Sequence, residues 1–399
     1  MAKVPRGERL VLTIIGKRNA GKSSLINALT GQDISIVSDT PGTTTDPVAK
    51  AYELLPLGPV TIYDTAGIDD VGSLGEERVK RTRKILFRTD IALIVTESNE
   101  IDTDLEKLIA DIQAMHIPFI LVFNKADVKP LPETTAKRCI ERNIAYSSVS
   151  SVDGKGIRML KEKLMMLAPL EMSNEQVLVS DLLRPGQTVL LVVPIDLAAP
   201  KGRLILPQVQ VLREVLDSDA IGIIVKEREL EKSLTELSRK PDLVITDSQV
   251  VLKVVGDIDP DVKLTTFSTL FARYKGNFET LIEGAKQIDK LKDGDKLLIA
   301  ESCSHHVQPD DIGRVKIPRW IRQYTGKDLQ FDVFSGHDFP DDLESYALVL
   351  HCGACMTNRM EVIRRMMECE RRGVKITNYG IAISKLHGVL ERVIAPFFG

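Results

Sequence analysis

The stretch LVLTIIGKRNAGKSS, residues 10–24, places an apolar run directly before the pattern G-x-x-x-x-G-K-S. The run predicts a buried strand over 10–15, and the pattern predicts a phosphate-binding loop that opens a helix. Glycines in such a loop let backbone N–H groups curl around phosphates, and the helix N-terminus adds positive potential. We expect Lys22 to reach the β- and γ-phosphates of a nucleotide and Ser23 to bind Mg²⁺. The other residues expected to line this loop are Gly16, Asn19, Ala20, Gly21 and Ser24.

Two further motifs each follow an apolar run. DTAG (64–67) follows VTIY, and NKAD (124–127) follows FILVF. Asp64 should lie near the magnesium ion, with the N–H of Gly67 near the γ-phosphate. Asp127, in a motif shared with Asn124 and Lys125, can accept hydrogen bonds from guanine N1–H and the exocyclic amine. Adenine lacks that pair of donors, so the sequence predicts a GTP site at the carboxyl ends of the strands.

Apolar runs alternate with helical segments along the chain, which predicts an α/β fold. Up to about residue 170 the alternation predicts a parallel sheet with helices on both faces, and AYELLPLGPVTIYD (51–64) predicts a hairpin within it. The polar stretch EMSNEQ (171–176) reads as a linker. We therefore expect a P-loop domain followed by two further α/β domains with mostly parallel sheets. Their expected bounds are 1–170, 175–265 and 266–399, with a long helix over 271–291.

The composition narrows the class of protein. The chain has 399 residues, 53 Lys and Arg against 56 Asp and Glu, and a net charge of -3. Proteins that bind nucleic acids or membrane surfaces usually carry a basic excess, so we expect neither partner. There is no run of 18 apolar residues, and the first ten residues lack an apolar segment. A cytoplasmic protein without a membrane span is therefore expected.

The five cysteines fall into two groups. Cys139 and Cys369 lie within helical segments and read as buried structural thiols. Cys303 follows the apolar run KLLIAE (296–301), whereas Cys352 and Cys355 follow YALVLH (346–351). If these two runs form neighbouring parallel strands, all three thiols lie at one edge of the sheet.

Three kinds of site fit these three thiols. A redox C-x-x-C pair leaves Cys303 without a role. A structural zinc ion with three cysteines and one histidine is chemically sound, and so is an iron–sulfur cluster on three thiolates. The chemistry of the side chains alone does not separate zinc from iron–sulfur.

The nucleotide motifs resemble those of the small-GTPase-like family. Ser150-Ser151-Val152 matches its last guanine-contacting loop, although Ser151 stands where alanine is usual. Asn19 and GTTTD (42–46) resemble the Era-type and tRNA-modification GTPases, which implies that Asn19 helps hold K⁺ and that Thr44 is the switch threonine on Mg²⁺. Ile68 occupies the place of the water-orienting glutamine and cannot hydrogen-bond a water. We therefore expect slow hydrolysis of GTP, faster in K⁺ than in Na⁺.

The whole chain resembles the HydF family, the GTPases of FeFe-hydrogenase maturation. The resemblance rests on this GTPase motif set, a middle α/β domain and a terminal C-x-H … H-C-x-x-C pattern. It implies that Cys303, Cys352 and Cys355 bind a 4Fe–4S cluster, with His305 or His351 as a candidate fourth ligand. It also implies a homodimer that receives a diiron precursor from two radical-SAM maturases and delivers it to apo FeFe-hydrogenase.

Two other functions remain open from the sequence. The P-loop class alone also suits a ribosome- or tRNA-acting GTPase with a structural zinc site. That function predicts an RNA module with a basic face, which the acidic balance disfavours. A zinc-stabilised GTPase whose terminal domain binds protein is the third hypothesis, and metal analysis separates it from the first.

Overall fold

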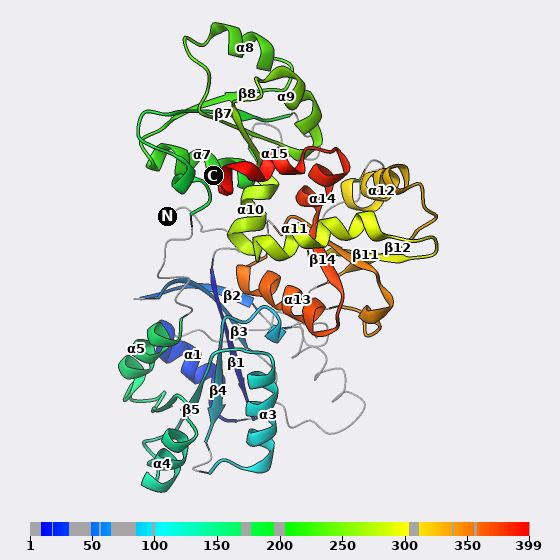
Figure 1. Ribbon diagram of the computed structural model, residues 1–399. Coiled ribbons are helices and arrows are strands. Elements are labelled where there is room, and N and C mark those ends of the chain that lie inside the picture. The colour runs from blue at the N-terminus through cyan, green and yellow to red at the C-terminus, as the bar shows by residue number, and fades with distance from the viewer. Residues whose placement is uncertain are drawn as a thin grey trace, which may run out of the picture. The chain divides into compact units, whose positions relative to one another are not determined.

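The computed structural model describes most of the chain, with gaps at both ends and between elements. The described residues are 9–17, 19–31, 49–55, 57–64, 85–97, 100–168, 177–194, 204–302, 311–336, 339–354 and 357–398. The chain forms two compact units, Met1–Glu175 and Gln176–Gly399, which are described separately below (Figure 1). Within the described ranges no helix combines the length and the apolar character needed to cross a bilayer.

The first unit contains a six-stranded sheet with the strand order β2-β3-β1-β4-β5-β6. All pairs are parallel except β2 and β3, which form the expected antiparallel hairpin. Strand β1 lies between β3 and β4, so the strand order reverses beside it. The strands are β1 (Leu10–Gly16), β2 (Ala49–Leu54), β3 (Gly58–Asp64), β4 (Ile91–Thr96), β5 (Phe119–Phe123) and β6 (Tyr146–Ser148).

Helices cover both faces of this sheet, as the alternating pattern predicts. Helices α1 (Lys22–Thr30) and α5 (Ile157–Leu167) pack on one face, and α3 (Thr103–Ala114) and α4 (Glu133–Glu141) pack on the other. Cys139 is fully buried in α4, where burial raises the pKa of its thiol. This cysteine is a core residue, as expected.

The second unit contains two four-stranded sheets, and all of their strand pairs are parallel. The middle sheet has the order β10-β9-β7-β8 and the terminal sheet the order β12-β11-β13-β14. In each sheet the first strand along the chain lies inside, so the strand order reverses beside β7 and beside β11. The middle strands are β7 (Thr188–Val192), β8 (Ile221–Val225), β9 (Leu243–Thr246) and β10 (Lys263–Thr266). The terminal strands are β11 (Lys296–Glu301), β12 (Gln330–Ser335), β13 (Leu348–His351) and β14 (Lys375–Asn378).

The middle sheet takes one of its helices from the end of the chain. Helices α7 (Leu206–Asp217) and α10 (Phe267–Lys275) pack on one face, and α8 (Leu230–Glu236) and α9 (Val251–Asp257) pack on the other. The last helix, α15 (Leu390–Ile394), joins α8 and α9 and contacts β10, as the red ribbon against the green domain shows in Figure 1. The middle and terminal domains are therefore packed into one unit.

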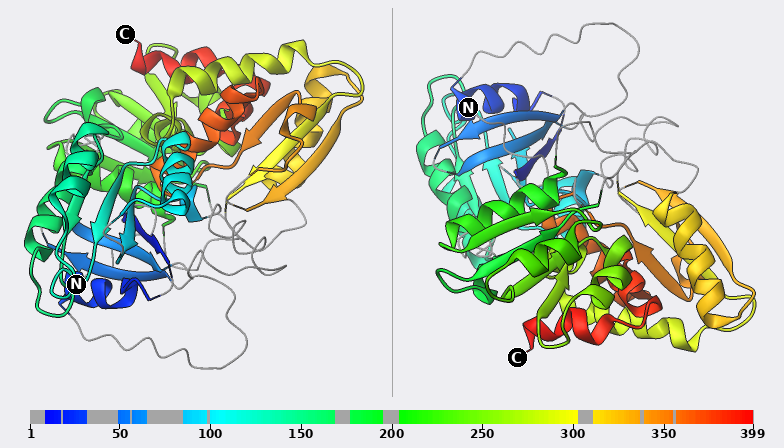
Figure 2. Two further views of the ribbon diagram at one scale, coloured as in Figure 1. Left: turned by 90° about the horizontal axis from the view of Figure 1, so that it is seen from below. Right: turned by 90° about the horizontal axis from the view of Figure 1, so that it is seen from above.

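The terminal sheet is also covered on both faces; its elements run from yellow to red in Figure 2. Helices α11 (Phe278–Lys286) and α13 (Arg359–Arg371) pack on one face, and α12 (Ile317–Thr325) and α14 (Tyr379–Leu386) pack on the other. Cys369 is fully buried in α13, and burial raises its pKa to about 12. This cysteine too belongs to the core, as expected.

The long helix expected over 271–291 is two helices. Helix α10 ends at Lys275 and α11 begins at Phe278. Asn277 lies between them and caps α11, because its side-chain Oδ1 accepts a hydrogen bond from the N–H of Thr280 at 3.0 Å. This local cap competes with a continuous helix and prevails over the apolar periodicity.

Helix α11 offers a test of the packing on the terminal sheet. A Cβ atom at Gly284 would lie 1.9 Å from the carbonyl oxygen of Ile376 in β14. Gly284→Ala should therefore lower the free energy of unfolding by about 2 kcal/mol or more. The matched control is Gly256→Ala in α9, where a Cβ atom meets open space. It should stabilise the protein by roughly 0.5–1 kcal/mol. Urea unfolding of the two variants measures both changes, and a shift of the same sign in both contradicts the packing.

Candidate functional site

The loop between β1 and α1 has the geometry of a phosphate-binding loop. Gly16 packs against β4 so closely that a Cβ atom would lie 2.1 Å from the carbonyl oxygen of Val95. Gly21 has a φ of 83°, and a Cβ atom there would lie 2.3 Å from Nδ2 of Asn124. Helix α1 begins without a side-chain cap and without an acidic residue in its first turn. Its N-terminal N–H groups and their positive potential are therefore available to an anion.

The expected magnesium ligands meet beside this loop. The Ser23 hydroxyl donates to Oδ2 of Asp64 at 3.4 Å. The other carboxylate oxygen of Asp64, Oδ1, is buried and makes no hydrogen bond to the described residues. Burial raises the pKa of Asp64, while Lys22 and Ser23 oppose this rise. A buried carboxylate oxygen beside a hydroxyl fits the oxygen ligands that Mg²⁺ prefers.

Lys22 folds back over the loop. Its ammonium donates to the carbonyl oxygens of Gly16 at 3.0 Å and Lys17 at 2.9 Å. The cation therefore lies above the N-terminus of α1, where the phosphates of a nucleotide would lie.

Asn124 ties the phosphate loop to the loop after β6. Its amide nitrogen donates to the carbonyl oxygens of Ala20 at 3.0 Å and Gly21 at 3.3 Å. Its Oδ1 accepts from the hydroxyl of Ser151 at 2.8 Å and from the backbone N–H of Ser151 at 3.3 Å. The serine that replaces the usual alanine thus adds a second hydrogen bond to a contact that the backbone N–H already makes.

The two loops expected to bind guanine lie together at the ends of β5 and β6. The N–H of Ala126 donates to the carbonyl oxygen of Val149 at 3.0 Å. Ser150 is buried, and Asp127 is exposed, so its carboxylate is open to a base. Lys125 has a φ of 60° and forms an ion pair with Glu97. Guanine binding at these loops stays a prediction.

The structure says less about four of the expected site residues, Asn19, Thr44, Gly67 and Ile68. Asn19 is exposed, has a φ of 63° and makes no side-chain hydrogen bond within the described part of the chain. It therefore has no packing role there, and asparagine tolerates the left-handed conformation better than most residues. Thr44, Gly67 and Ile68 lie outside the described residues.

The thiol motifs follow neighbouring strands, which meets the condition set for bringing the thiols to one edge of the sheet. Strands β11 and β13 are parallel and adjacent, and the N–H of Cys352 donates to the carbonyl oxygen of Ala300 at 3.0 Å. The N–H of Ser302 donates to Sγ of Cys352 at 3.4 Å. Ser302 directly precedes Cys303 in the chain. The two thiol motifs therefore begin side by side, where the strand order of the terminal sheet reverses.

The rest of the expected thiol set is not described. Cys303, His305 and Cys355 lie outside the described residues. Within the described ranges no three His, Cys, Asp or Glu side chains form a group that could hold a metal ion. The gathering of three thiols around a metal stays a prediction.

His351 is buried at the end of β13. Its Nδ1 donates to the carbonyl oxygen of Cys352 at 2.6 Å, so its Nε2 is the acceptor for the Arg365 guanidinium at 3.0 Å. Burial, assisted by the charge of Arg365, lowers the pKa of His351 to about 3. The imidazole is therefore neutral at physiological pH. An iron ion would have to displace Arg365 to bind Nε2.

Three buried polar side chains around Cys352 were not identified from the sequence. Arg365 is fully buried and also donates to the hydroxyl of Ser302 at 2.9 Å. Lys275 is 4% exposed and bonds to the carbonyl oxygens of the loop after Cys352. The Tyr379 hydroxyl makes no hydrogen bond to the described residues, and burial raises its pKa well above its ordinary value, with a further contribution from Cys352. The sequence signal that could have identified Arg365 and Lys275 is their place in the helical period, because each falls among the buried residues of its helix.

These side chains fit a thiolate-bound group. Two buried cations lie beside the motif, and the Tyr379 hydroxyl is a donor without an acceptor among the described residues. The N–H of Ser302 already points at Sγ of Cys352.

Comparison with known protein families covers most of the chain. The description "Hydrogen maturase F tetramerization domain" matches residues 279–396, and "Hydrogen maturase F dimerization domain" matches residues 178–276. The chain belongs to the hydrogen maturase F family. The description "50S ribosome-binding GTPase" matches residues 11–125, so this HydF-family chain also carries a GTPase domain.

Individual relatives match over shorter stretches. The tRNA modification GTPase MnmE of Methylococcus capsulatus is 34% identical over 171 residues, which is 43% of this chain and 37% of the relative. GTPase Der of Wolinella succinogenes is 38% identical over 162 residues, which is 38% of this chain and 34% of the relative. The chain thus spans about a third of the length of these relatives.

Solved structures give weaker matches. The G domain of the T. maritima FeoB iron transporter is 24% identical, with a TM-score of 0.33 over 41% of this chain and 100% of that chain. Aquifex aeolicus Era is 19% identical, with a TM-score of 0.34 over 54% of this chain and 92% of that chain.

The hydrogen bonds of Asn124 to the phosphate loop predict that two substitutions will weaken GTP binding to different extents. Asn124→Ala removes the bonds to Ala20 and Gly21 and should weaken GTP binding by more than about tenfold. Ser151→Ala keeps the backbone N–H donor and should weaken binding by no more than about fivefold. Titration with a fluorescent GTP analogue measures both. Equal losses would show that Asn124 does not hold the phosphate loop.

Proposed function

We propose that this HydF-family chain is a slow, K⁺-stimulated GTPase and an iron–sulfur scaffold for hydrogenase assembly. Cys303, Cys352 and Cys355 bind a 4Fe–4S cluster, and the diiron precursor is assembled there and delivered to apo FeFe-hydrogenase. One observation carries the proposal. The N–H of Ser302, the residue before Cys303, donates to Sγ of Cys352 inside a domain of the hydrogen maturase F family. The expected cofactors are GTP, Mg²⁺, K⁺ and the cluster.

The nucleotide half of the proposal rests on the phosphate loop. Lys22 and the N-terminus of α1 hold the phosphates, and Ser23 and Asp64 supply the oxygen ligands for Mg²⁺, which stabilises charge on the transferring phosphoryl group. Asp127 selects guanine. Ile68 cannot orient the attacking water, which keeps the intrinsic rate low. Asn19, whose side chain is exposed, is the proposed K⁺ ligand.

The thiol half rests on the surroundings of Cys352. The Ser302 N–H stabilises negative charge on the sulfur, and the buried cations Arg365 and Lys275 add positive potential. With three thiolates, the cluster offers one iron site that is open to exchange. For that site we favour His305 over His351, because Nε2 of His351 already accepts a hydrogen bond from Arg365.

The roles of GTP and of the partners are part of the same proposal. Hydrolysis need not perform the metal chemistry; it can bias contacts between domains or the release of partners, because the γ-phosphate orders switch loops that relax afterwards. The matches to dimerization and tetramerization domains support an oligomer, and the working form that we propose is a homodimer. Two radical-SAM maturases and apo-hydrogenase are the proposed partners, in the cytoplasm.

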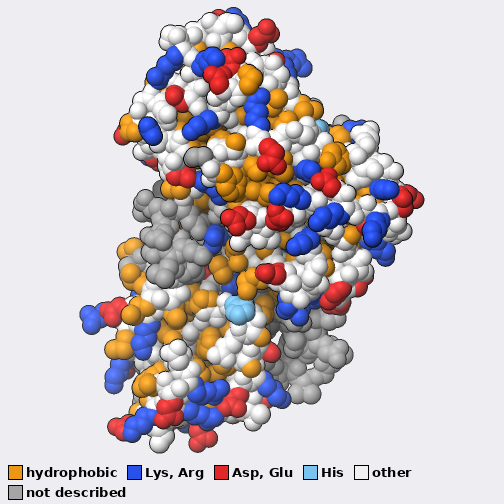
Figure 3. Space-filling model, viewed as in Figure 1, with side chains coloured by type: hydrophobic (Ala, Val, Ile, Leu, Met, Phe, Trp, Pro, Cys, Tyr) orange, Lys and Arg blue, Asp and Glu red, His pale blue; other side chains and the backbone are white. Residues whose placement is uncertain are grey.

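A ribosome- or tRNA-acting GTPase with a structural zinc site is not favoured. The second unit matches hydrogen maturase F domains over almost its whole length. On the face shown in Figure 3, Lys and Arg side chains are interspersed with Asp and Glu rather than gathered into a basic field. An RNA-binding surface needs such a field.

The first test concerns K⁺. GTP hydrolysis by the full chain should be faster in KCl than in NaCl at equal ionic strength, because K⁺ held by Asn19 supplies positive charge at the phosphates. Asn19→Ala should remove the difference between the two salts. A phosphate-release assay gives both rates. Equal rates of the wild-type protein in the two salts would contradict the role of Asn19.

The second test concerns the metal. Anaerobically purified protein, reconstituted with iron and sulfide, should hold about four iron atoms per chain and show an EPR signal after reduction. Cys352→Ser should lose both, whereas Cys139→Ala, which changes a core cysteine of the first unit, should keep them. A zinc ion without iron, or unchanged spectra in Cys352→Ser, would overturn the cluster.

A further inference from the structure

Lys275, the last residue of α10, holds the loop that carries two of the thiols. We call the described residues Cys352, Gly353, Ala354 and Thr357 the thiol loop. The Lys275 ammonium is 4% exposed and donates to the carbonyl oxygens of Ala354 and Thr357, each at 2.8 Å. These two carbonyls lie on either side of Cys355 in the sequence. One buried cation therefore holds the thiol loop at two points.

The thiol loop needs such a restraint. Ala354 has a φ of 53°, a left-handed conformation that disfavours residues with a Cβ atom. The carbonyl oxygen of Ala354 also accepts from the N–H of Thr357 at 3.3 Å and from its hydroxyl at 3.1 Å, so the two residues that Lys275 contacts are also bonded to each other. Hydrogen bonds from an ammonium are stronger than neutral ones, particularly away from water. Lys275 thus stabilises a backbone conformation that is unfavourable by itself.

Two residues earlier, Arg273 holds a different part of the chain. Its guanidinium pairs with both carboxylate oxygens of Asp181 at 2.7 Å. It also donates to the carbonyl oxygens of Val177 at 3.3 Å and Leu178 at 3.0 Å. We call residues 177–181 the entry segment, because they are the first described residues after the stretch that joins the two units.

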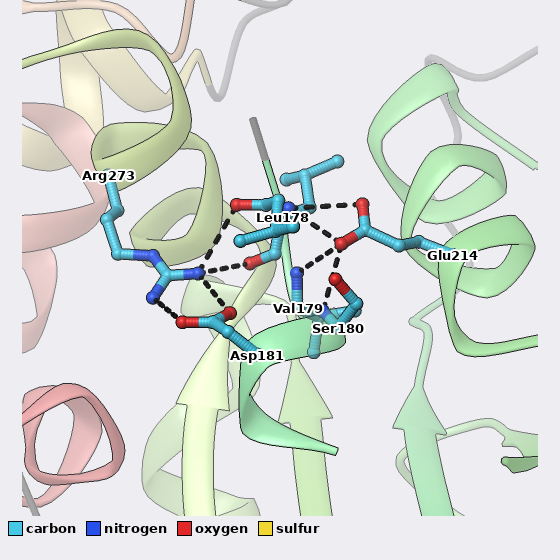
Figure 4. A network of polar contacts seen from close by, with 7 residues as sticks. Leu178, Val179, Ser180, Asp181, Glu214 and Arg273 are labelled. Carbon is cyan, nitrogen blue, oxygen red and sulfur yellow. Dashed lines mark hydrogen bonds and ion pairs between the residues drawn. The ribbon is translucent and has the colours of Figure 1, made fainter. Parts of the chain in front are cut away.

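The entry segment is held from a second side by Glu214 of α7. One carboxylate oxygen of Glu214 accepts from the N–H groups of Leu178 at 2.8 Å, Val179 at 2.9 Å and Ser180 at 2.9 Å. Figure 4 shows the segment between the two side chains. Arg273 and Glu214 both hold the entry segment, but only Arg273 lies on the same helix as Lys275.

We propose that α10 links the entry segment to the thiol loop, with Arg273 gripping the segment and Lys275 positioning the loop. The helix is suited to this role because Leu270 and Phe271 fix it in the middle core while Ala272 belongs to the terminal core. A displacement of the entry segment shifts Arg273 and α10, and through Lys275 it shifts the turn around Ala354. The effect of this link on the retention of iron rests on the cluster function proposed above. The link itself can be tested in iron-free protein.

The first experiment uses the iron-free, reduced full chain. It compares wild type with Lys275→Met, Arg273→Met and Glu214→Met by the alkylation rate of Cys352 and by hydrogen exchange. Lys275→Met should raise the alkylation rate at least about tenfold, because the turn loses two charge-assisted hydrogen bonds. Lys275→Gln, which keeps one amide donor, is the second variant and should give an intermediate rate. Wild-type rates in these variants would overturn the role of Lys275.

The comparison of the two anchors tests the link. Arg273→Met should speed hydrogen exchange in the entry segment and also in the thiol loop, which Arg273 does not hold. The matched control, Glu214→Met, should speed exchange in the entry segment alone. If the thiol loop responds equally to both variants, or to neither, α10 is not the link.

The second experiment adds iron. In reconstituted protein the rate of iron loss to a chelator should rise at least about tenfold in Lys275→Met and less in Arg273→Met, with Glu214→Met like wild type. Wild-type rates of loss in Lys275→Met would overturn the bearing of the link on iron. Wild-type protein that binds no iron would overturn the cluster function instead, and the iron-free result would still decide the link.

Discussion

Both candidate sites depend on one constraint, the reversal of strand order beside an inner parallel strand. Strand β1 lies between β3 and β4, and β11 lies between β12 and β13. The loops that leave neighbouring strands at such a point run in opposite directions and open a crevice. Ser23 contacts Asp64 at the first of these points, and Ser302 contacts Cys352 at the second. The same topology therefore brings together residues that lie 41 and 50 positions apart in the chain.

The sequence predicted the inner strands and the motifs at their ends, because a strand that is buried on both faces reads as a continuous apolar run. Runs such as FILVF (119–123) and KLLIAE (296–301) are almost wholly buried, and each polar motif begins where its run ends. The adjacency of β11 and β13 was only a condition of the sequence analysis, and the structure supplies it. One edge strand of the terminal sheet, β12, leaves no such mark in the sequence. Strand β12 is largely exposed, with only Phe331 and Phe334 packed against the cores, and its residues do not form an apolar run.

The parts that sequence reading missed depend on contacts from distant elements. His351 looked like a candidate ligand because it stands beside Cys352. Its Nε2, however, accepts from Arg365, which α13 brings up from 14 positions later. The break at Asn277 was missed for a different reason, since a single capping side chain outweighs several turns of apolar periodicity. In both cases the deciding interaction is one hydrogen bond that composition and periodicity do not report.

The net charge of -3 also says nothing of the potential inside the terminal domain. Arg365 and Lys275 are both buried beside the thiol motifs, and their partners include a hydroxyl, an imidazole and backbone carbonyls. A buried charge acts more strongly on its surroundings than an exposed one, because little water screens it. The local potential is therefore set by where these two cations lie and not by the overall balance of charges.

The arrangement of the cores limits how a nucleotide could act on the thiol loop through the chain. The two units are joined covalently by the stretch before Val177. Beyond that stretch the first side chains to hold the backbone are Glu214 and Arg273, one on each side. Helix α7 contributes to the middle core, whereas α10 contributes to the middle and the terminal cores. Of the two helices that hold the entry segment, α10 is therefore the one that also packs in the core of the terminal domain, and its last residue, Lys275, is bonded to the thiol loop.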